Sequence, residues 1–138
     1  MNYLLDTNVL AEFKKKQPSA KVIDWLNAQI EESLFISVVT VGEIQKGIAA
    51  LPVSKRRTAL AEWLEELIYR YDKRILPLDV KVLRQWGEIT GKLEKKGRVL
   101  PLMDSLIAAT AITYQMTIVT RNTVDFEKTG APVLDVWQ

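Results

Sequence analysis

The sequence predicts an α/β fold, a parallel-sheet domain with helix-rich connections, from two observations. Short apolar or β-branched runs alternate along the chain with segments that repeat apolar residues at helical spacing, and this alternation is typical of βαβ units. The first apolar run, in MNYLLDTN, stops abruptly at the polar residues Asp6, Thr7 and Asn8. A parallel sheet binds its ligands where its strands end, so the polar triplet marks the edge at which a site is expected.

The first third of the chain predicts a strand, two helices and a second strand. Tyr3–Leu5 forms the first strand, and Asp6 or Thr7 can cap a short helix that ends in the lysine run before Pro18. Residues 22–30 have helical spacing, and the brief run LFIS at 34–37 favours the second strand.

The middle of the chain predicts a helical hairpin followed by a third helix. One helix covers 38–51 and stops at Pro52, and a second covers 54–71 behind a Ser54 cap. ILPLD is a short strand or an extended link, and an amphipathic helix follows that ends at Gly97.

The last third predicts a central helix and two more strands. Residues 101–114 are apolar almost all round, which indicates a helix covered on both sides, with Pro101 at its first position. The β-branched run TIVT indicates a strand, TRNTVDF a turn, and APVLDV a final strand.

Composition excludes several kinds of chemistry. The chain has 138 residues, 48% of them hydrophobic and 26% charged, which fits one folded domain. It contains neither Cys nor His, so thiol nucleophiles, disulfides, the Ser-His-Asp triad and ordinary zinc sites are excluded. An enzyme of this composition must use carboxylates, Lys, hydroxyls or a metal ion held by oxygen ligands.

Charge and hydropathy bear on location and partners. No signal-like segment precedes LLDTN and no apolar run approaches the roughly 18 residues of a membrane span, so we expect a cytoplasmic protein with no membrane contact. The net charge is +2, but basic residues cluster at 14–16, 55–57, 73–74 and 92–98. Such clusters favour a polyanion, although solvated helix faces produce the same pattern.

Acidic residues stand at four notable places. Asp6 ends the first strand, while the TIVT strand delivers Arg121, Asn122 and then Asp125 to the same edge if the strands are parallel. Asp104 lies in the opening turn of the apolar central helix, and Glu43 interrupts an otherwise apolar helix.

Each acid also has a structural interpretation. Asp6 can be a helix cap and Asp125 a turn former. Asp104 can complement a helix dipole, which is worth about 0.3 to 1 kcal/mol, and Glu43 can pair with Lys46 for roughly 0.2 to 0.5 kcal/mol. The fold would nevertheless bring all four to one sheet edge.

Clustered carboxylates repel each other, because two unit charges 4 Å apart cost about 4 kcal/mol at an effective dielectric constant of about 20. A divalent cation removes that penalty. Mg²⁺ or Mn²⁺ suits such oxygen-only sites, with one or two direct carboxylates and waters completing the shell.

In this order and at these separations, LLDTNVL, VGEI, DSLIAATA and TIVTRNTVDF resemble the PIN-domain ribonucleases, and most of all the VapC toxins of toxin-antitoxin modules, including the FitB-like branch. The resemblance covers essentially the whole chain. It implies a single PIN-like nuclease domain over residues 1–138, a three-layer α/β/α sandwich with a central, mostly parallel twisted sheet.

The resemblance also implies a site around Mg²⁺ or Mn²⁺. Its acidic pocket carries over to Asp6, Glu43 and Asp104, with Asp6 and Asp104 as metal ligands. The fourth acid varies in position among relatives. Here the nearest carboxylate is Asp125, while some relatives place theirs at Asn122. The hydroxyls of Thr7 and Thr120 would support the site, and Asn8 would be structural.

The implied function is hydrolysis of RNA phosphodiester bonds by a water that the cation activates. The RNA would be an unpaired loop of a structured RNA, such as a tRNA or rRNA. The family further implies a cognate VapB-like antitoxin, which alone binds operator DNA, and a homodimer; the helix at 54–71 is our candidate partner surface.

Two other functions remain open from the sequence. Asp6 after an apolar strand is compatible with a haloacid-dehalogenase-like phosphatase, but that family has a second aspartate where this chain has Asn8. A catalytically inactive PIN-like module that binds RNA or protein is the other alternative.

Overall fold

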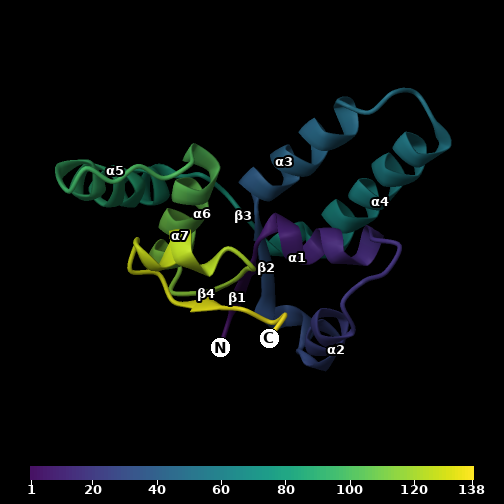
Figure 1. Cartoon of the computed structure of the whole chain (residues 1–138), viewed down its shortest axis with the longest axis horizontal. Helices are drawn as coiled ribbons and strands as arrows, with labels where there is room; N and C mark the ends of the chain where they lie inside the picture. The colour runs from purple at the N-terminus through teal and green to yellow at the C-terminus, as the bar shows by residue number, and fades with distance from the viewer.

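A computed structural model describes residues 1–138 and contains a five-stranded sheet in the order β3-β2-β1-β4-β5. Every neighbouring pair of strands is parallel. The strands are β1 (Tyr3–Leu5), β2 (Leu34–Ser37), β3 (Ile75–Leu76), β4 (Thr117–Val119) and β5 (Val133–Leu134). The parallel sheet predicted from the alternating pattern is confirmed, with β1 at its centre (Figure 1).

Seven α-helices connect the strands. They are α1 (Thr7–Ala11), α2 (Ala20–Ala28), α3 (Val38–Ala49), α4 (Lys55–Tyr71), α5 (Val80–Lys95), α6 (Leu102–Thr113) and α7 (Thr123–Glu127). Short 3₁₀ turns stand at Glu12–Lys14, Glu31–Ser33 and Asp72–Arg74. No helix combines the length and the apolar character needed to cross a bilayer.

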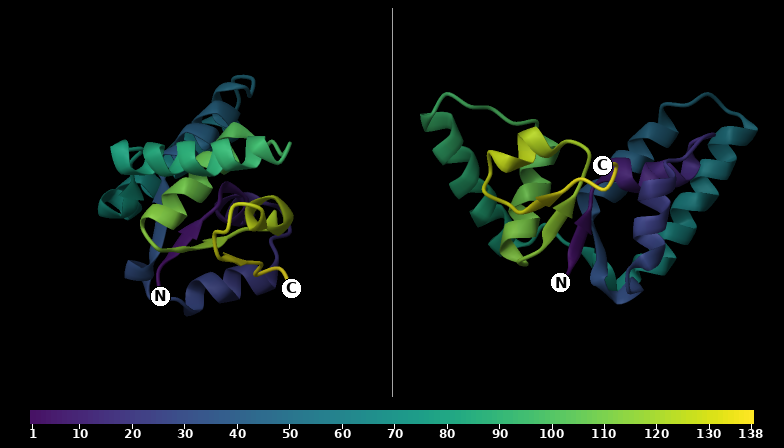
Figure 2. Two further views of the ribbon diagram at one scale, coloured as in Figure 1. Left: turned by 90° about the vertical axis from the view of Figure 1, so that its left-hand side faces the viewer. Right: turned by 60° about the horizontal axis from the view of Figure 1, so that its bottom comes forward.

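The two faces of the sheet bury different helices, as a three-layer α/β/α sandwich requires. Leu5 and Val119 point into a core shared with α1, α2, α3 and α4. Leu4 and Ile118, one residue earlier on the same strands, point into a second core with α6 and α7. This alternation follows from the two-residue period of a strand. Figure 2 shows the two groups of helices on opposite sides of the sheet.

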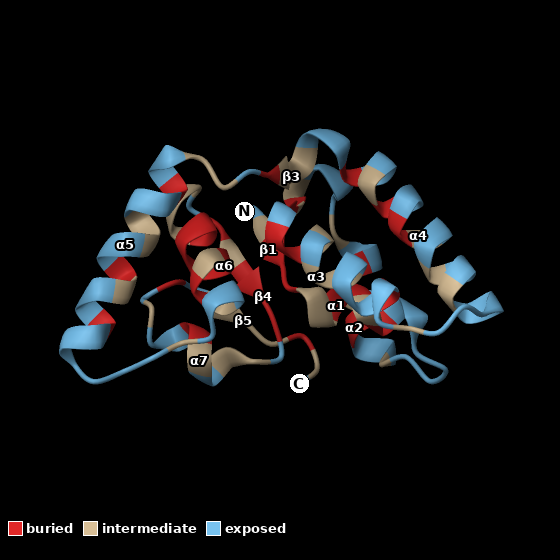
Figure 3. Cartoon of the chain, turned by 90° about the horizontal axis from the view of Figure 1, so that it is seen from above, coloured by how far each residue is buried: buried red, intermediate tan, exposed pale blue.

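The helices α3 and α4 form the predicted hairpin (Figures 1 and 2). The Ser54 hydroxyl caps α4 by accepting a hydrogen bond from the Arg57 amide at 3.1 Å. The inner side of α4 is buried through Leu64, Leu67 and Tyr71, whereas its outer side is exposed (Figure 3). The hairpin therefore packs as part of the fold rather than as a separate arm.

The helix α6 lies between the sheet and α5, which confirms that it is covered on both sides. Ala108 and Ala111 face the sheet, and Ala109 packs against Val82 and Ile89 of α5. The helix α5 ends as predicted at Gly97, which adopts a φ of +70°.

Two local predictions are corrected. The segment 120–126 is not a simple turn, because its second half forms the one-turn helix α7, which buries Phe126 completely. Pro101 precedes α6 as its N-cap instead of occupying its first helical position.

Candidate active site

The polar residues that follow β1 and β4 meet at the carboxyl edge of the sheet. The two strands pair in parallel with Leu5 opposite Val119, so the next residues, Asp6 and Thr120, also lie side by side. The Thr120 hydroxyl donates a hydrogen bond of 2.8 Å to Asp6 Oδ2. Strand register alone thus fixes the first contact of the site.

Asp6 is held firmly in a buried position, with 6% of its surface exposed. It caps α1, and its Oδ1 accepts a hydrogen bond of 2.8 Å from the Thr7 amide. Burial raises the pKa of Asp6, while the hydrogen bonds from Thr120 and the Thr7 amide act in the opposite direction. The carboxylate is therefore held in one orientation, and its burial makes ionisation costly.

Glu43 reaches the same region from α3. Its Oε1 accepts a hydrogen bond of 2.8 Å from the Thr7 hydroxyl, which ties α3 to the first turn after β1. No ion pair joins Glu43 to Lys46 within 4.0 Å, so the helix-pair interpretation is wrong. A side chain at Gly47 would meet no atom within 4 Å, in keeping with the open space expected there.

Asp104 projects from the first turn of α6. The small residues Ala108 and Ala111, both fully buried, let this helix approach the sheet closely. Burial and then the negative charges of Asp6, Glu43 and Asp125 raise the pKa of Asp104 from 3.8 to about 6. The four predicted acids are therefore close enough to influence one another electrostatically.

Asn122 joins the last two acids. Its Nδ2 donates hydrogen bonds of 3.3 Å to Asp104 Oδ2 and 3.1 Å to Asp125 Oδ2. Its backbone amide donates to the Thr120 hydroxyl at 3.0 Å. Asn122 and Asp125 are thus both part of the cluster, and the Asn122 amide bridges the carboxylates of Asp104 and Asp125.

All seven predicted site residues consequently belong to one hydrogen-bonded group, which we call the acidic cluster: Asp6, Thr7, Glu43, Asp104, Thr120, Asn122 and Asp125. No three of its carboxylates converge tightly enough to make a complete cage for a metal ion. The donor set still suits Mg²⁺ or Mn²⁺, because these ions take one or two direct carboxylates and keep several waters.

Three further residues lie near the cluster. Arg121 follows β4 as predicted, but its guanidinium lies over the Trp137 ring, 5.5 Å from the centroid. Asn8 Nδ2 donates hydrogen bonds of 3.4 Å to Asp6 Oδ2 and to Thr120 Oγ1, contacts that agree with the structural role expected of it. Sequence reasoning missed Lys128, whose Nζ is 3.7 Å from Asp125 Oδ1. Lys128 lies three residues after Asp125, a spacing that indicates an ion pair only within a helix, and α7 was not predicted as one.

An apolar pocket opens beside Glu43. It has a volume of about 390 Å³ and lies between α3 and α6, next to the cluster. Its lining residues are Val38, Val39, Gly42, Glu43, Lys46, Leu78, Met103 and Leu106.

A parallel α/β sandwich with linked carboxylates beyond the ends of its central strands belongs to the class of α/β domains that carry their site at the carboxyl edge of the sheet. The sequence matches the PIN domain model over residues 3–132, and the chain belongs to the PIN-domain family.

Relatives similar over nearly their whole length support this assignment. The chain is 38% identical to the plasmid stability protein StbB of Pseudomonas syringae pv. tomato, with 98% of each chain covered. It is 36% identical to the VapC ribonuclease Y4jK of Sinorhizobium fredii, covering 98% of this chain and 97% of the relative. It is also 36% identical to the toxin FitB of Neisseria gonorrhoeae, covering 97% of each.

Solved structures agree with the fold. A structure of FitAB bound to an IR36 DNA fragment superposes with a TM-score of 0.93 at 34% identity, covering 99% of this chain and 96% of that one. VapBC2 of Rickettsia felis, bound to a DNA fragment from its promoter, superposes with a TM-score of 0.81 at 26% identity, covering 97% and 98%.

Proposed function

We propose that this chain is a divalent-metal-dependent endoribonuclease, one PIN domain over residues 1–138, that acts as the toxin of a type II toxin-antitoxin system. The observation that supports this most directly is the acidic cluster, in which four carboxylates from four separate segments share one hydrogen-bonded group. Two relatives of this length are described as a VapC ribonuclease and as a toxin. Membership of the PIN family displaces the phosphatase alternative.

Asp6 and Asp104 are the residues that would hold Mg²⁺ or Mn²⁺. When bound, such an ion supplies a water of lowered pKa and stabilises negative charge on the phosphoryl oxygens. The raised pKa values of Asp6 and Asp104 support this assignment. Burial and neighbouring negative charges make the ionised form of these carboxylates unfavourable, and a bound cation would offset that cost.

The remaining cluster residues position the acids and handle the proton. Glu43, fixed by the Thr7 hydroxyl, can orient the attacking water and accept its proton. Thr120 fixes the Asp6 carboxylate, and Asn122 holds Asp104 and Asp125 side by side. This chemistry uses carboxylates throughout, as a chain without His and Cys requires.

The proposal includes the partners that the family suggests. The substrate is an unpaired loop of a structured RNA such as tRNA or rRNA, because single-stranded bases are the readable part of RNA. A cognate VapB-like antitoxin neutralises the enzyme in the cytoplasm and alone contacts operator DNA. The similar FitAB and VapBC2 complexes, which were solved bound to DNA, support a two-component assembly that binds DNA. The active form is a homodimer.

The test is cleavage of cellular RNA by the purified protein with Mg²⁺ or Mn²⁺. We expect cleavage that EDTA abolishes and that Asp104→Asn reduces at least about 100-fold, since the substitution removes a charge from the metal site. Asp24→Asn is the matched control, because Asp24 is an exposed aspartate on α2, and it should cleave normally. RNA binding without cleavage at any metal concentration would favour the inactive binding module instead.

A further inference from the structure

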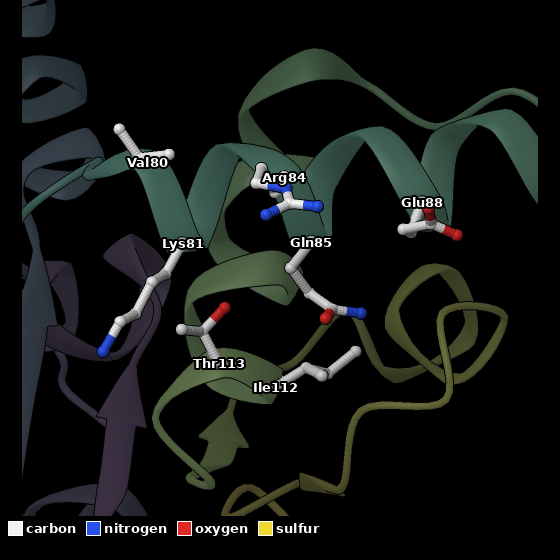
Figure 4. A pocket seen from close by; sticks show the side chains of 7 residues that line it. All are labelled: Val80, Lys81, Arg84, Gln85, Glu88, Ile112 and Thr113. Atoms are coloured by element: carbon white, nitrogen blue, oxygen red, sulfur yellow. The ribbon is translucent and has the colours of Figure 1, made fainter.

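Two adjoining pockets line the length of α5. One, of about 490 Å³, lies between the first half of α5 and the end of α6. The other, of about 420 Å³, continues along α5 to the loop after α7 and shares Gln85, Glu88 and Ile112 with the first. We call the pair the α5 groove. In Figure 4, Gln85 reaches down from α5 toward Ile112 of α6, while the Lys81 side chain extends down and away at the left-hand end of the pocket.

Positive charge dominates the α5 groove. Five basic residues line it against the single acid Glu88: Lys81, Arg84, Lys92, Lys96 and Lys128. Three of them have no carboxylate within 4.0 Å, namely Lys81, Arg84 and Lys96. Lys92 Nζ and Glu88 Oε2 are 4.0 Å apart, and both side chains are largely exposed. Such an exposed ion pair is weak, so Glu88 offsets little of the positive charge of the groove.

The basic residues of α5 are spaced along one side of the helix. Lys81 and Lys92 are eleven residues apart, which is about three whole helical turns, and Arg84 lies within one turn of Lys81. At about 1.5 Å of rise per residue, Lys81 to Lys92 spans about 16 Å. A row of cations of this length matches several consecutive phosphates of an extended strand.

Lys128 connects the α5 groove to the acidic cluster. It lines the groove, and its Nζ also lies 3.7 Å from Asp125 Oδ1. Asp125 and Asp104 both accept hydrogen bonds from the Asn122 side chain. A polyanion lying in the groove therefore arrives next to the carboxylates.

We propose that the α5 groove binds the sugar-phosphate backbone of single-stranded RNA on its way to the acidic cluster. This inference rests on the proposed ribonuclease function and adds the path of the substrate. An acidic peptide fits less well, because the strongest anchors of protein and peptide interfaces are most often aromatic side chains in apolar pockets. The groove has no aromatic side chain, and polar and charged residues make up most of its lining. A phosphate backbone needs only spaced cations.

The lining also predicts how the groove binds. Without aromatic side chains it has no platform on which bases can stack, so binding should depend on charge and little on base sequence. Selection of the cleavage site is then left to the cluster and its apolar neighbour pocket.

The experiment measures binding of a labelled single-stranded RNA in EDTA, so that no cleavage occurs. The groove variant is Lys81→Gln/Arg84→Gln/Lys92→Gln, and the matched control is Lys55→Gln/Arg56→Gln/Arg57→Gln at the tip of the hairpin, which removes the same charge. For single-stranded nucleic acids, each phosphate contact adds about 0.7 to the steepness with which log K falls against log salt concentration. Removing three basic side chains should therefore reduce the magnitude of this slope by about 2. We expect the affinity of the groove variant at low salt to fall at least about tenfold.

Two further results decide the proposal. The charge-conserving variant Lys81→Arg/Lys92→Arg should bind like the wild type, and circular dichroism should show the same fold in every variant. Equal losses in the groove and hairpin variants, or none in the groove variant, would overturn the α5 groove as the binding path. Wild-type cleavage of RNA with Mn²⁺ tests the proposed function separately, so its failure is distinguishable from failure of the groove.

Discussion

At the scale of single residues, Asn122 stands out because one side-chain amide group hydrogen-bonds two of the four acids. Its Nδ2 donates to Asp104 and to Asp125, and a neutral donor between two carboxylates offsets part of their repulsion. A carboxylate at this position would instead add a fifth negative charge. The identity of this one side chain therefore adjusts how strongly the cluster needs a cation.

Replacing Asn122 with Asp should make the fold more dependent on metal. We expect Asn122→Asp to lower the melting temperature in EDTA, because a donor becomes a like charge, and to tighten Mn²⁺ binding measured by calorimetry. Asn27→Asp adds the same charge on the exposed part of α2 and should change neither quantity. A variant with unchanged Mn²⁺ affinity would show that position 122 lies outside the influence of the ion.

Asp104 makes the stability of the metal-free protein depend on pH. Its pKa rises from 3.8 to about 6 on folding, so between these values the folded protein keeps a proton that the unfolded chain has released. The free energy of unfolding therefore falls as pH rises through this window, and the loss is complete above about pH 6. The raised pKa of Asp6 acts in the same direction.

Substitution of Asp104 isolates its contribution. In EDTA, Asp104→Asn should be more stable than the wild type above about pH 6 and equally stable below pH 3.8, as measured by urea denaturation. The Asn122 amide can still donate to the new side-chain oxygen. A stability difference that is constant across this pH range would contradict a raised pKa at Asp104.

At the scale of elements, helix ends and helix faces place the chemistry. The small residues of α6 bring Asp104 to the sheet edge, and the strand register brings Asp6 to Thr120. The helix α5 ends in a Schellman motif, in which the Arg98 amide donates to the Leu93 carbonyl and the Gly97 amide to the Glu94 carbonyl, both at 2.9 Å. This stop turns the chain back so that α6 can begin beside the site.

Two glycines of this region offer a matched test. Gly97 has a φ of +70°, where an L side chain is strained, so Gly97→Ala should destabilise the protein by about 1 kcal/mol. Gly91 lies on the exposed side of α5, and a Cβ there meets no atom within 4 Å. Gly91→Ala should instead stabilise the protein by about 0.8 kcal/mol.

Denaturant midpoints of the two alanine variants give the comparison. Opposite shifts support the helix end as described, since the chemical change is the same in both. Equal shifts would mean that the left-handed backbone at position 97 is not maintained in solution.

At the scale of the whole molecule, local sequence patterns predicted the helices and strands more completely than they predicted the side-chain contacts between them. The parallel sheet, the hairpin and the doubly covered α6 follow from periodicity and helix caps, which are local signals. The helix α7 escaped prediction because five residues are too few to show a period, and burial of Phe126 decides its conformation.

The contacts of the site depend on packing that no local pattern encodes. The bond between Thr7 and Glu43 forms only because α1 and α3 pack together on one face of the sheet. The proximity of Lys128 to Asp125 depends on the unpredicted α7. The acids could be selected from the sequence because a carboxylate in an apolar helix or at a strand end is costly, whereas the hydroxyl and amide groups that link them carry no such signal.

Because the acidic cluster draws on β1, α3, α6 and the segment after β4, an ion bound there should stabilise the entire fold. A ligand that binds only the folded state adds about 2.7 kcal/mol at 100 times its Kd. For a chain of this size we therefore expect saturating Mn²⁺ to raise the melting temperature by on the order of 8 °C.

The same measurement locates the ion. Asp24→Asn should keep the Mn²⁺-dependent rise in melting temperature, while Asp104→Asn should lose most of it, because only the second substitution removes a cluster ligand. The helix α4 carries a second group of carboxylates, the exposed residues Glu62, Glu65 and Glu66. A rise that survives in Asp104→Asn but disappears in Glu62→Gln/Glu65→Gln/Glu66→Gln would place the ion on the hairpin and separate metal binding from the sheet edge.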